Sequence, residues 1–306
     1  MSVPASPAMD RYEELLALFE QGLRTLDDKP EETPDTALRA LWLLAAGQPM
    51  SAQAATGRPL PPLTSQQHSA LDTLVQKRLD GIPLAHLTGR QRFMDVELLA
   101  GAQALIPRRE TELLGRAAAR RLADIVAERG TAIALDACTG SGNLALGIAS
   151  AVPGARLLAC DLSEDAVALA RANVVHLGLQ HRVELRQGDL LAPFDEPDWH
   201  GRIDVLVCNP PYISSAKVPA MAQEIADFEP SLAFDGGPFG VRILNRLIQE
   251  APKFIREGGW LAFEVGAGQG PSVMRRLASA GKFKSIEPLA NEAGEVRAFL
   301  AQHGSK

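Results

Sequence analysis

Strand-like and helix-like segments alternate along the chain from Glu112 onward, and this alternation restricts the fold more than any other feature. Short apolar runs are separated by segments in which apolar residues recur every three or four positions. Such alternation is typical of a parallel sheet covered by helices on both faces, which binds ligands beyond the carboxyl ends of its strands. The predicted strands are 131–140, 155–161, 182–190, 202–212 and 260–266, the predicted helices are 143–152, 163–178 and 241–259, and a final hairpin is expected over 284–302.

The part of the chain before Arg90 has a different pattern. From Asp10 to Arg90, leucine, phenylalanine and tryptophan recur at helical spacing, and the proline-rich segment 56–65 interrupts this pattern as a loop. A hairpin is predicted over 90–107, between this helical part and the α/β part. The predicted divisions are a helical N-terminal domain over residues 1–90, a hairpin linker over 91–111 and an α/β domain over 112–306.

The composition is that of a globular protein. The chain of 306 residues is 46% hydrophobic and 22% charged, which suffices for a sizeable core. Its net charge of −6 and isoelectric point near 5.6 argue against a large non-specific nucleic-acid surface. No apolar stretch reaches bilayer-spanning length, and the N-terminus turns acidic and amphipathic, so we expect a cytoplasmic protein without a membrane anchor.

Three cysteines, Cys138, Cys160 and Cys208, each lie in an apolar, strand-like run. Their odd number and wide spacing suit buried thiols in a reducing compartment. No His-x-His or Cys-x-x-Cys spacing accompanies them, so no metal site is predicted.

The first candidate site is the glycine loop that follows the strand at 131–140. Gly140 and Gly142 allow a tight turn and a close approach of the backbone to a ligand, and the helix that follows presents its N-terminal amides. Asp161 ends the next strand, where its carboxylate can accept from a ribose hydroxyl. The same spacing satisfies the dinucleotide fingerprint, so a nicotinamide-dependent oxidoreductase is a competing interpretation.

Two further carboxylates favour S-adenosylmethionine over a dinucleotide. Asp136 lies in the strand ahead of the glycines, where it could accept from the amino group of a cationic ligand or from the loop's own amides. Asp189 ends the third strand and could accept from the amino group of adenine. With S-adenosylmethionine bound, Asp136 would lie near the methionine end, Asp161 at the ribose and Asp189 at the base.

The second candidate site is the tetrapeptide Asn-Pro-Pro-Tyr at the end of the fourth strand. An NH₂ group conjugated to a carbonyl or an aromatic ring is a poor nucleophile, because its lone pair is delocalised. The side-chain carbonyl of Asn209 and the backbone carbonyl of Pro210 could hold both hydrogens of such a group and aim its nitrogen at a methyl donor. Pro211 keeps residue 210 extended, and the ring of Tyr212 can lie against the flat group. A rigid turn without chemistry is the plainer alternative.

These motifs resemble the class I S-adenosylmethionine-dependent methyltransferases that modify amide or exocyclic amino nitrogens. More narrowly, segments 78–114, 209–214, 228–244 and 258–270 are similar to the HemK/PrmC family of protein-glutamine N5-methyltransferases. The resemblance runs from about residue 35 to the C-terminus. It implies a smaller helical domain that recognises the substrate and a seven-stranded, Rossmann-like α/β catalytic domain. It also implies S-adenosylmethionine as cofactor and methylation of the glutamine in the Gly-Gly-Gln loop of peptide-chain release factors.

The resemblance also carries over to individual positions. It implies that the substrate is held by Asn209, Pro210, Pro211 and Tyr212. Together with the three acids and the amide already discussed, the predicted cofactor-binding set is Asp136, Cys138, Thr139, Gly140, Ser141, Gly142, Asp161, Asp189, Leu190 and Asn209. The expected partner is a protein, with no membrane and no stable nucleic-acid binding.

Three positions depart from the family pattern. Cys138 replaces the usual glycine before the glycine turn, Leu190 replaces a residue that is often aromatic, and the common IPRPETE reads IPRRETE here. These departures do not change the predicted reaction type, but they weaken the prediction of which substrate is methylated. Ribosomal protein L3, another protein, or an adenine of a nucleic acid therefore remain alternative substrates.

Other polar residues near these motifs have two open interpretations. Arg108, Arg109, Glu110 and Glu112 either frame the cofactor pocket or simply start a helix. Glu264, at the end of the fifth strand, either shapes the pocket or caps a loop. The glycine-rich segment 228–240 is expected to cover the substrate, with Gly236 and Gly237 giving it backbone freedom.

Overall fold

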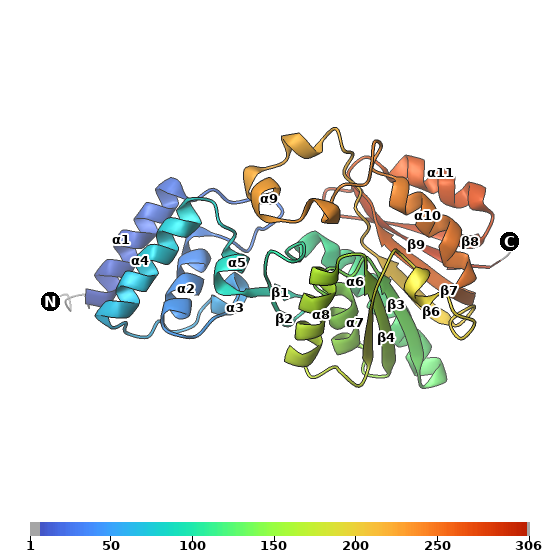
Figure 1. The fold of residues 1–306 in the computed structure, drawn as a ribbon, viewed down its shortest axis with the longest axis horizontal. Helices are drawn as coiled ribbons and strands as arrows, with labels where there is room; N and C mark the ends of the chain where they lie inside the picture. Colours follow the sequence, from blue (N-terminus) through green and yellow to red (C-terminus); the bar gives the residue numbers. More distant parts are fainter. Residues whose placement is uncertain (1–6, 305–306) are drawn as a thin grey trace.

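The computed structural model describes residues 7–304, and the first six and last two residues of the predicted domains lie outside this range. Its centre is a seven-stranded sheet with the order β5-β4-β3-β6-β7-β9-β8, in which β9 alone runs antiparallel to the rest. The predicted α/β fold is confirmed, and Figure 1 shows the sheet beside a separate group of N-terminal helices. The strands are β3 (Ala132–Ala137), β4 (Ala155–Asp161), β5 (Val183–Gln187), β6 (Ile203–Cys208), β7 (Ile255–Glu264), β8 (Phe283–Ala290) and β9 (Val296–His303).

Helices cover both faces of the sheet, as the apolar runs of its central strands require. Every residue of β6 is buried, which is typical of a strand with helices above and below it. One face packs against α6 (Glu112–Arg129), α7 (Asn143–Ala151) and α8 (Glu164–His176), and the other packs against α10 (Arg242–Glu250) and α11 (Gly270–Ala280). The parallel strands β3, β4 and β6 therefore end at one common edge, where both predicted sites lie.

The predicted helix over 241–259 is too long. It ends at Glu250, a short 3-10 turn follows at Ala251–Lys253, and β7 already begins at Ile255. Pro252 cannot continue the helical hydrogen bonding, and Gly258, with φ of 77°, lies where the register between β6 and β7 shifts. The start of β7 at Ile255 could not be predicted from the sequence, because two glycines interrupt the apolar pattern of the strand.

Five helices form the N-terminal part: α1 (Pro7–Gly22), α2 (Pro34–Ala45), α3 (Ala52–Ala55), α4 (Ser65–Leu79) and α5 (Leu84–Thr88). They enclose a core of their own around Phe19, Leu41 and Trp42. Thr33 and Thr64 begin α2 and α4 with reciprocal capping hydrogen bonds. None of the helices within residues 7–304 combines the length and apolarity that a bilayer span requires.

The hairpin between the two parts is anchored on the α/β part. It consists of β1 (Arg90–Phe93) and β2 (Val96–Leu99), and its turn places Met94 and Asp95 at positive φ. Met94 is buried between α6 and α7, where a Cβ on Gly115 would lie 2.3 Å from its sulfur and one on Gly147 3.0 Å from it. Asn173 of α8 accepts from Leu99 N at 2.6 Å. The hairpin is therefore a fixed part of the packing, and the remainder of the predicted hairpin segment, residues 100–107, forms no strand.

Candidate active site

The glycine loop connects β3 to α7 and begins directly after the strand. Cys138, Gly140 and Gly142 all have positive φ, at 58°, 55° and 85°. Thr139 N donates to Cys160 O at 2.9 Å, which ties the loop to β4. A left-handed conformation favours glycine, so the structure explains why a glycine is usual at position 138 and why cysteine there is strained.

Asp136 serves the loop and not the pocket. Its Oδ2 accepts from Thr139 Oγ1 at 2.6 Å and from Ala145 N at 3.0 Å. Burial raises the pKa of Asp136 to about 7, and the two hydrogen bonds act in the opposite direction. Asp136, Ser141 and Gly142 are buried behind the loop and do not line the pocket. Asp136 thus meets the second of its two predicted roles, as an acceptor for the loop's own amides, and the contact of these three residues with a ligand stays a prediction.

Asp161 faces the pocket while it holds the loop. Its Oδ2 accepts from Gly140 N at 2.8 Å and its Oδ1 from Ser163 N at 2.9 Å. Burial raises the pKa of this carboxyl, and the backbone hydrogen bonds lower it. Each oxygen of a carboxylate has two lone pairs, so both can accept a second hydrogen bond from a ligand hydroxyl.

Asp189 lies two residues beyond the last residue of β5, and not at the strand's end as predicted. It lines the pocket, and both of its oxygens accept from Arg246 Nη1 at 2.9 Å. Its neighbour Leu190 is buried with φ of 51°, and Leu190 O accepts from Cys160 Sγ at 2.8 Å. In this structure, Asp189 therefore faces the pocket and pairs with Arg246 at the same time.

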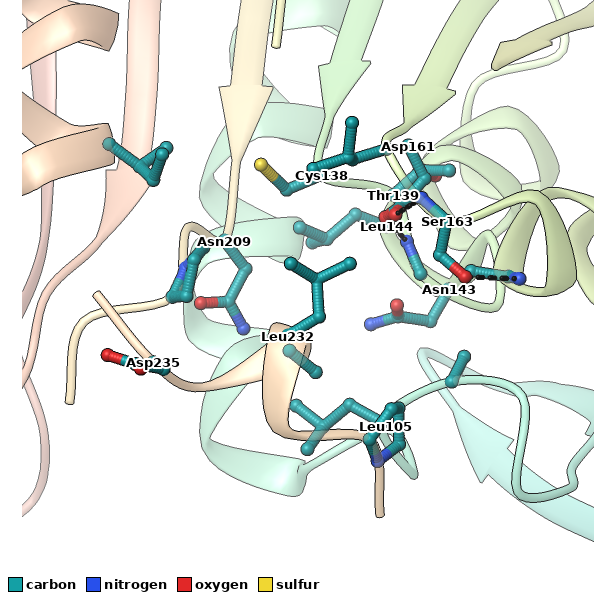
Figure 2. Close-up of a pocket in the computed structure, with 18 of the residues that line it drawn as sticks. Leu105, Cys138, Thr139, Asn143, Leu144, Asp161, Ser163, Asn209, Leu232 and Asp235 are labelled. Carbon is teal, nitrogen blue, oxygen red and sulfur yellow. Dashed lines mark hydrogen bonds between the residues drawn. The ribbon is translucent and has the colours of Figure 1, made fainter. Parts of the chain in front are cut away.

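These strand ends surround a pocket that encloses about 1160 Å³, its open mouth included. This is enough for a ligand larger than a nucleoside. Figure 2 shows Cys138 and Asn209 on one side and Asp161 with Ser163 on the other, while Leu105 and Leu232 face the strand ends from across the space. The predicted residues that line this pocket are Cys138, Thr139, Gly140, Asp161, Asp189, Leu190, Asn209 and Pro211.

A second, smaller cavity of about 460 Å³ adjoins the first at the tetrapeptide. Pro210 and Tyr212 line only this cavity, Pro211 lines only the first, and Asn209 lines both. Met221, Ile225 and Phe234 supply apolar walls, and Asp28 and Glu110 supply carboxylates. The tetrapeptide thus separates two binding spaces, and Asn209 is the predicted catalytic residue that touches both.

Hydrogen bonds fix both ends of the tetrapeptide. Asn209 Nδ2 donates to Thr111 Oγ1 at 3.3 Å, and Tyr212 OH donates to Glu264 Oε1 at 2.9 Å. Within residues 7–304, no protein hydrogen bond reaches Asn209 Oδ1 or the carbonyl of Pro210. Glu264 lines neither cavity, so it acts on the site through Tyr212. Two acceptor oxygens at the junction of the cavities remain available to a ligand.

The segment after the tetrapeptide, residues 213–241, forms the opposite wall of both cavities, and we call it the lid. It contains α9 (Gln223–Phe228), which Figure 1 shows between the N-terminal helices and α10. Its glycines rest directly on the tetrapeptide. A Cβ on Gly236 would lie 2.6 Å from Pro211 O, and one on Gly240 would lie 2.1 Å from Tyr212 O. Glycine is required at these two positions because the backbone of the lid lies too close to the tetrapeptide for a Cβ atom. Freedom of movement is the lesser reason.

Replacing Gly240 with alanine should therefore displace Tyr212. Gly240 has φ of 65°, so the new Cβ adds backbone strain to the clash, and we expect a loss of about 3 kcal/mol in unfolding free energy. Gly237→Ala is the matched control, because its φ is 86° but its Cβ would meet nothing closer than Arg242 Cβ at 3.5 Å. It should cost only about 1 kcal/mol. Urea denaturation measures both, and equal losses would contradict the close-contact explanation.

Buried ion pairs join the lid to the N-terminal helices. Glu224 of α9 accepts from Lys29 Nζ at 2.6 Å and from Arg78 Nη1 at 3.0 Å. Arg78 Nη2 also donates to Glu32 Oε2 at 3.2 Å. All four side chains are less than 10% exposed. The position of the lid over the cavities therefore depends on charges that the N-terminal domain supplies.

The position of Arg108 favours the first of its two interpretations, in which it frames the pocket. Its side chain is buried and lines both cavities, with Nε donating to Asp28 at 2.7 Å and Nη2 to Glu229 at 2.5 Å. It thus joins the linker, the N-terminal domain and the lid at the pocket wall. Glu110 also lines the second cavity and pairs with Arg297 at 2.9 Å. The sequence offered no way to find Asp28 and Glu229, because they lie 80 and 121 residues from Arg108.

Comparison with known proteins agrees with this geometry. The family profile described as PrmC N-terminal domain matches residues 10–89, and the profile described as methyltransferase domain matches residues 134–228. The release factor glutamine methyltransferase of Moorella thermoacetica is 39% identical over 227 residues, which cover 74% of this chain and 77% of that protein. The protein of the same name from Gloeobacter violaceus is 36% identical over 74% of this chain and 77% of its own length.

This chain belongs to the release factor glutamine methyltransferase family. Its fold has wider relatives as well. The solved hMettl16 catalytic domain in complex with an RNA hairpin aligns with a TM-score of 0.52 and 14% identity, covering 68% of this chain and 77% of that one. At this identity the likeness shows the fold alone. Family membership does not favour the competing oxidoreductase interpretation, because the matched domain is a methyltransferase domain.

S-adenosylmethionine is the methyl donor of this enzyme class, and the first cavity has the chemistry to hold it. Asp161 offers acceptor oxygens for ribose hydroxyls. Leu144 and Ile243 offer apolar walls for a base, and Arg242 offers a cation for a carboxylate. We place the donor in this cavity as a proposal.

Removing the carboxylate of Asp161 should weaken the cofactor site. Asp161→Ala loses charge-assisted hydrogen bonds worth about 1.5–3 kcal/mol, so the Kd of S-adenosylhomocysteine should rise about tenfold to a hundredfold. Isothermal calorimetry measures this affinity. Glu184→Ala makes the same charge change on β5 outside both cavities and should leave the Kd unchanged. An unchanged Kd for Asp161→Ala would exclude the proposed ribose contact.

Proposed function

We propose that this protein transfers a methyl group from S-adenosylmethionine to the side-chain amide nitrogen of the glutamine in the Gly-Gly-Gln loop of peptide-chain release factors. The name shared by its relatives supports this substrate. The observation that carries the proposal is the position of Asn209, which lines both adjoining cavities with its acceptor oxygen available. The two cavities then take the donor and the glutamine, and the tetrapeptide lies where they meet.

The residues of the tetrapeptide act by orienting the amide. S-adenosylmethionine, when bound, supplies an electrophilic methyl group on a positively charged sulfur. Asn209 Oδ1 and the carbonyl of Pro210 accept from the two N–H bonds of the substrate glutamine, which fixes the direction of its nitrogen. The ring of Tyr212 lies against the planar amide. The nitrogen loses a proton readily once it has become cationic, so these residues need not include a strong base.

We assign a separate role in this reaction to each part of the chain. Residues 1–90 recognise the substrate, residues 91–111 link the domains, and residues 112–306 carry out the transfer. The lid and Arg108 close the second cavity around the glutamine. The net charge of −6 favours a protein substrate over stable binding to nucleic acid, and a cytoplasmic location suits a partner that acts in translation.

Mass spectrometry tests the proposal directly. The protein is incubated with S-adenosylmethionine and either a release factor or ribosomal protein L3, and the digested peptides are compared with those from a reaction without enzyme. We expect one added methyl group on the Gly-Gly-Gln glutamine and none on ribosomal protein L3. Methylation of ribosomal protein L3 alone, or of neither protein, would contradict the proposed substrate.

A further inference from the structure

We infer that Asp235 and Arg242 form a subsite for a zwitterionic amino-acid group, which in this protein is the methionine end of S-adenosylmethionine. The inference deepens the proposed function, because it rests on the placement of the donor in the first cavity. Asp235 belongs to the lid, Arg242 begins α10, and both side chains line this cavity. Neither residue belongs to the glycine loop or to the tetrapeptide, the two motifs that the sequence analysis identified.

The charges of the first cavity single out these two residues. The charged side chains that line it are Arg108, Asp161, Asp189, Asp235 and Arg242. Ion pairs already neutralise Arg108 and Asp189, and Asp161 accepts from two backbone amides. Within residues 7–304, Asp235 and Arg242 form no ion pair with each other or with any other side chain. One anion and one cation of the cavity wall therefore remain for a ligand.

Hydrogen bonds hold the Asp235 carboxylate in place and leave one of its oxygens free. Oδ1 accepts from Ser215 Oγ at 2.7 Å and from Gly237 N at 2.9 Å. No protein hydrogen bond from the described part of the chain reaches Oδ2. The hydrogen bond from Ser215, and after it the one from Gly237, lowers the pKa of this carboxyl, so it is ionised near neutral pH. A fixed, ionised oxygen without a partner is a suitable acceptor for an ammonium group.

The backbone brings Arg242 next to this carboxylate. Arg242 N donates to Gly236 O at 3.2 Å, and a Cβ on Gly237 would lie 3.5 Å from Arg242 Cβ. Arg242 is exposed and Asp235 is half-buried, so the two charges lie where the cavity meets solvent. A ligand with an ammonium and a carboxylate on the same carbon can pair with both residues at once, because the planar guanidinium suits a carboxylate.

The subsite also lies on the correct side of Asn209 for the methionine end. Figure 2 shows Asp161 and Asp235 on opposite sides of the pocket, with Asn209 between them in this view. The sulfur of S-adenosylmethionine carries the methylene of the ribose, the methyl group and the amino-acid chain. With the ribose at Asp161 and the methyl group directed at Asn209, the amino-acid chain extends away from Asp161 and toward Asp235.

Arg108 is the other cation of the first cavity, and it is less suited to the ligand's carboxylate. Its Nε and Nη2 donate to Asp28 and Glu229, and its Nη1 donates to Ile106 O at 2.8 Å. A further carboxylate would have to share a guanidinium that two carboxylates already neutralise. Arg242 has no such partner among the described residues, so the inference assigns the carboxylate of the ligand to Arg242.

Calorimetry with two ligands tests the inference. S-adenosylhomocysteine contains the amino-acid end, and methylthioadenosine has the same nucleoside and thioether sulfur without it. We expect Asp235→Asn and Arg242→Gln each to raise the Kd of S-adenosylhomocysteine about tenfold, and to leave that of methylthioadenosine within about twofold. An unchanged Kd of S-adenosylhomocysteine in either variant, or equal losses for both ligands, would overturn the inference.

Two further variants serve as controls for this comparison. Asp161→Ala should weaken both ligands, because both contain the ribose. Asp227→Asn removes the same charge from an exposed position of the lid outside both cavities, and should weaken neither ligand. Retained binding of methylthioadenosine also shows that Asp235→Asn and Arg242→Gln are folded. If Asp227→Asn matched the loss in Asp235→Asn, the effect would be one of net charge and the subsite would be wrong.

A ligand with only one of the two charges assigns the residues separately. Decarboxylated S-adenosylhomocysteine keeps the ammonium group and lacks the carboxylate. Its Kd should rise about tenfold in Asp235→Asn and stay within about twofold of the parent in Arg242→Gln. The reverse pattern would overturn the inference, because it would place the ammonium group away from Asp235.

These measurements are made without a protein substrate, so the inference and the proposed function can fail separately. A parent that binds the ligands as expected but methylates no release factor would count against the proposed function alone. A parent that methylates release factors, while Asp235→Asn weakens both ligands equally, would count against this inference alone.

Discussion

Asn209→Ala should lose at least about a thousandfold in kcat, which is the largest effect we expect from any single substitution. The change removes the acceptor that lines both cavities, and none of the other described residues that line both cavities has a side-chain oxygen. Cofactor binding depends mainly on the loop and on Asp161, so the Kd of S-adenosylhomocysteine should change less than about fivefold. Single-turnover transfer to a release factor, at saturating cofactor, measures the effect.

Asn209→Asp tests the acceptor oxygen of this side chain separately from its NH₂ group. Aspartate keeps two acceptor oxygens but loses the N–H bonds that Thr111 accepts. We expect an activity between those of the parent and Asn209→Ala. If Asn209→Ala transferred methyl groups at the parent rate with confirmed cofactor saturation, the amide-holding mechanism would be wrong.

Glu224→Gln should loosen the lid by about 3 kcal/mol, because it removes the carboxylate that pairs with both buried cations, Lys29 and Arg78. The substitution keeps the shape of the side chain and removes its charge. Backbone amides of α9 should then exchange with solvent about a hundredfold faster. Lys29 would keep no ion-pair partner among the described residues, and Arg78 would keep only Glu32. Methyl transfer should also slow, since the lid forms one wall of both cavities.

The control for this effect lies on the surface of the N-terminal domain. Asp72→Ala breaks the pair between Arg11 and Asp72, whose side chains are 31% and 50% exposed, and should cost less than about 1 kcal/mol. Exchange of α9 in Asp72→Ala should match that of the parent. Unchanged α9 exchange in Glu224→Gln would show that the ion pairs do not hold the lid.

Local patterns were sufficient to predict most of the fold. The central strands β3, β4 and β6 are short, largely apolar runs, and Ser163 begins α8 with the expected cap, its side chain accepting from Ala166 N at 3.2 Å. The boundary of β7 was wrong because the helix stop at Pro252 and the glycines at 258 and 259 gave no strand signal. Propensity describes isolated segments, whereas β7 is extended by pairing with β6.

The candidate site could be predicted only where its residues are close in sequence. The tetrapeptide and the glycine loop are continuous motifs, and both lie at the cavities. The sequence left two roles open for Asp136, because it cannot show whether the carboxylate turns toward a ligand or, as in the structure, toward Ala145 N. Thr111, Glu224 and Glu229 were missed because their partners come from distant segments, which the fold alone brings together.

A crystal structure with S-adenosylhomocysteine and a glutamine peptide tests the central claim most directly. The account predicts that the glutamine side-chain nitrogen lies about 3 Å from both Asn209 Oδ1 and the carbonyl oxygen of Pro210, on the side that faces the sulfur. A nitrogen held by other residues, or an Asn209 amide whose NH₂ faces the peptide, would contradict it.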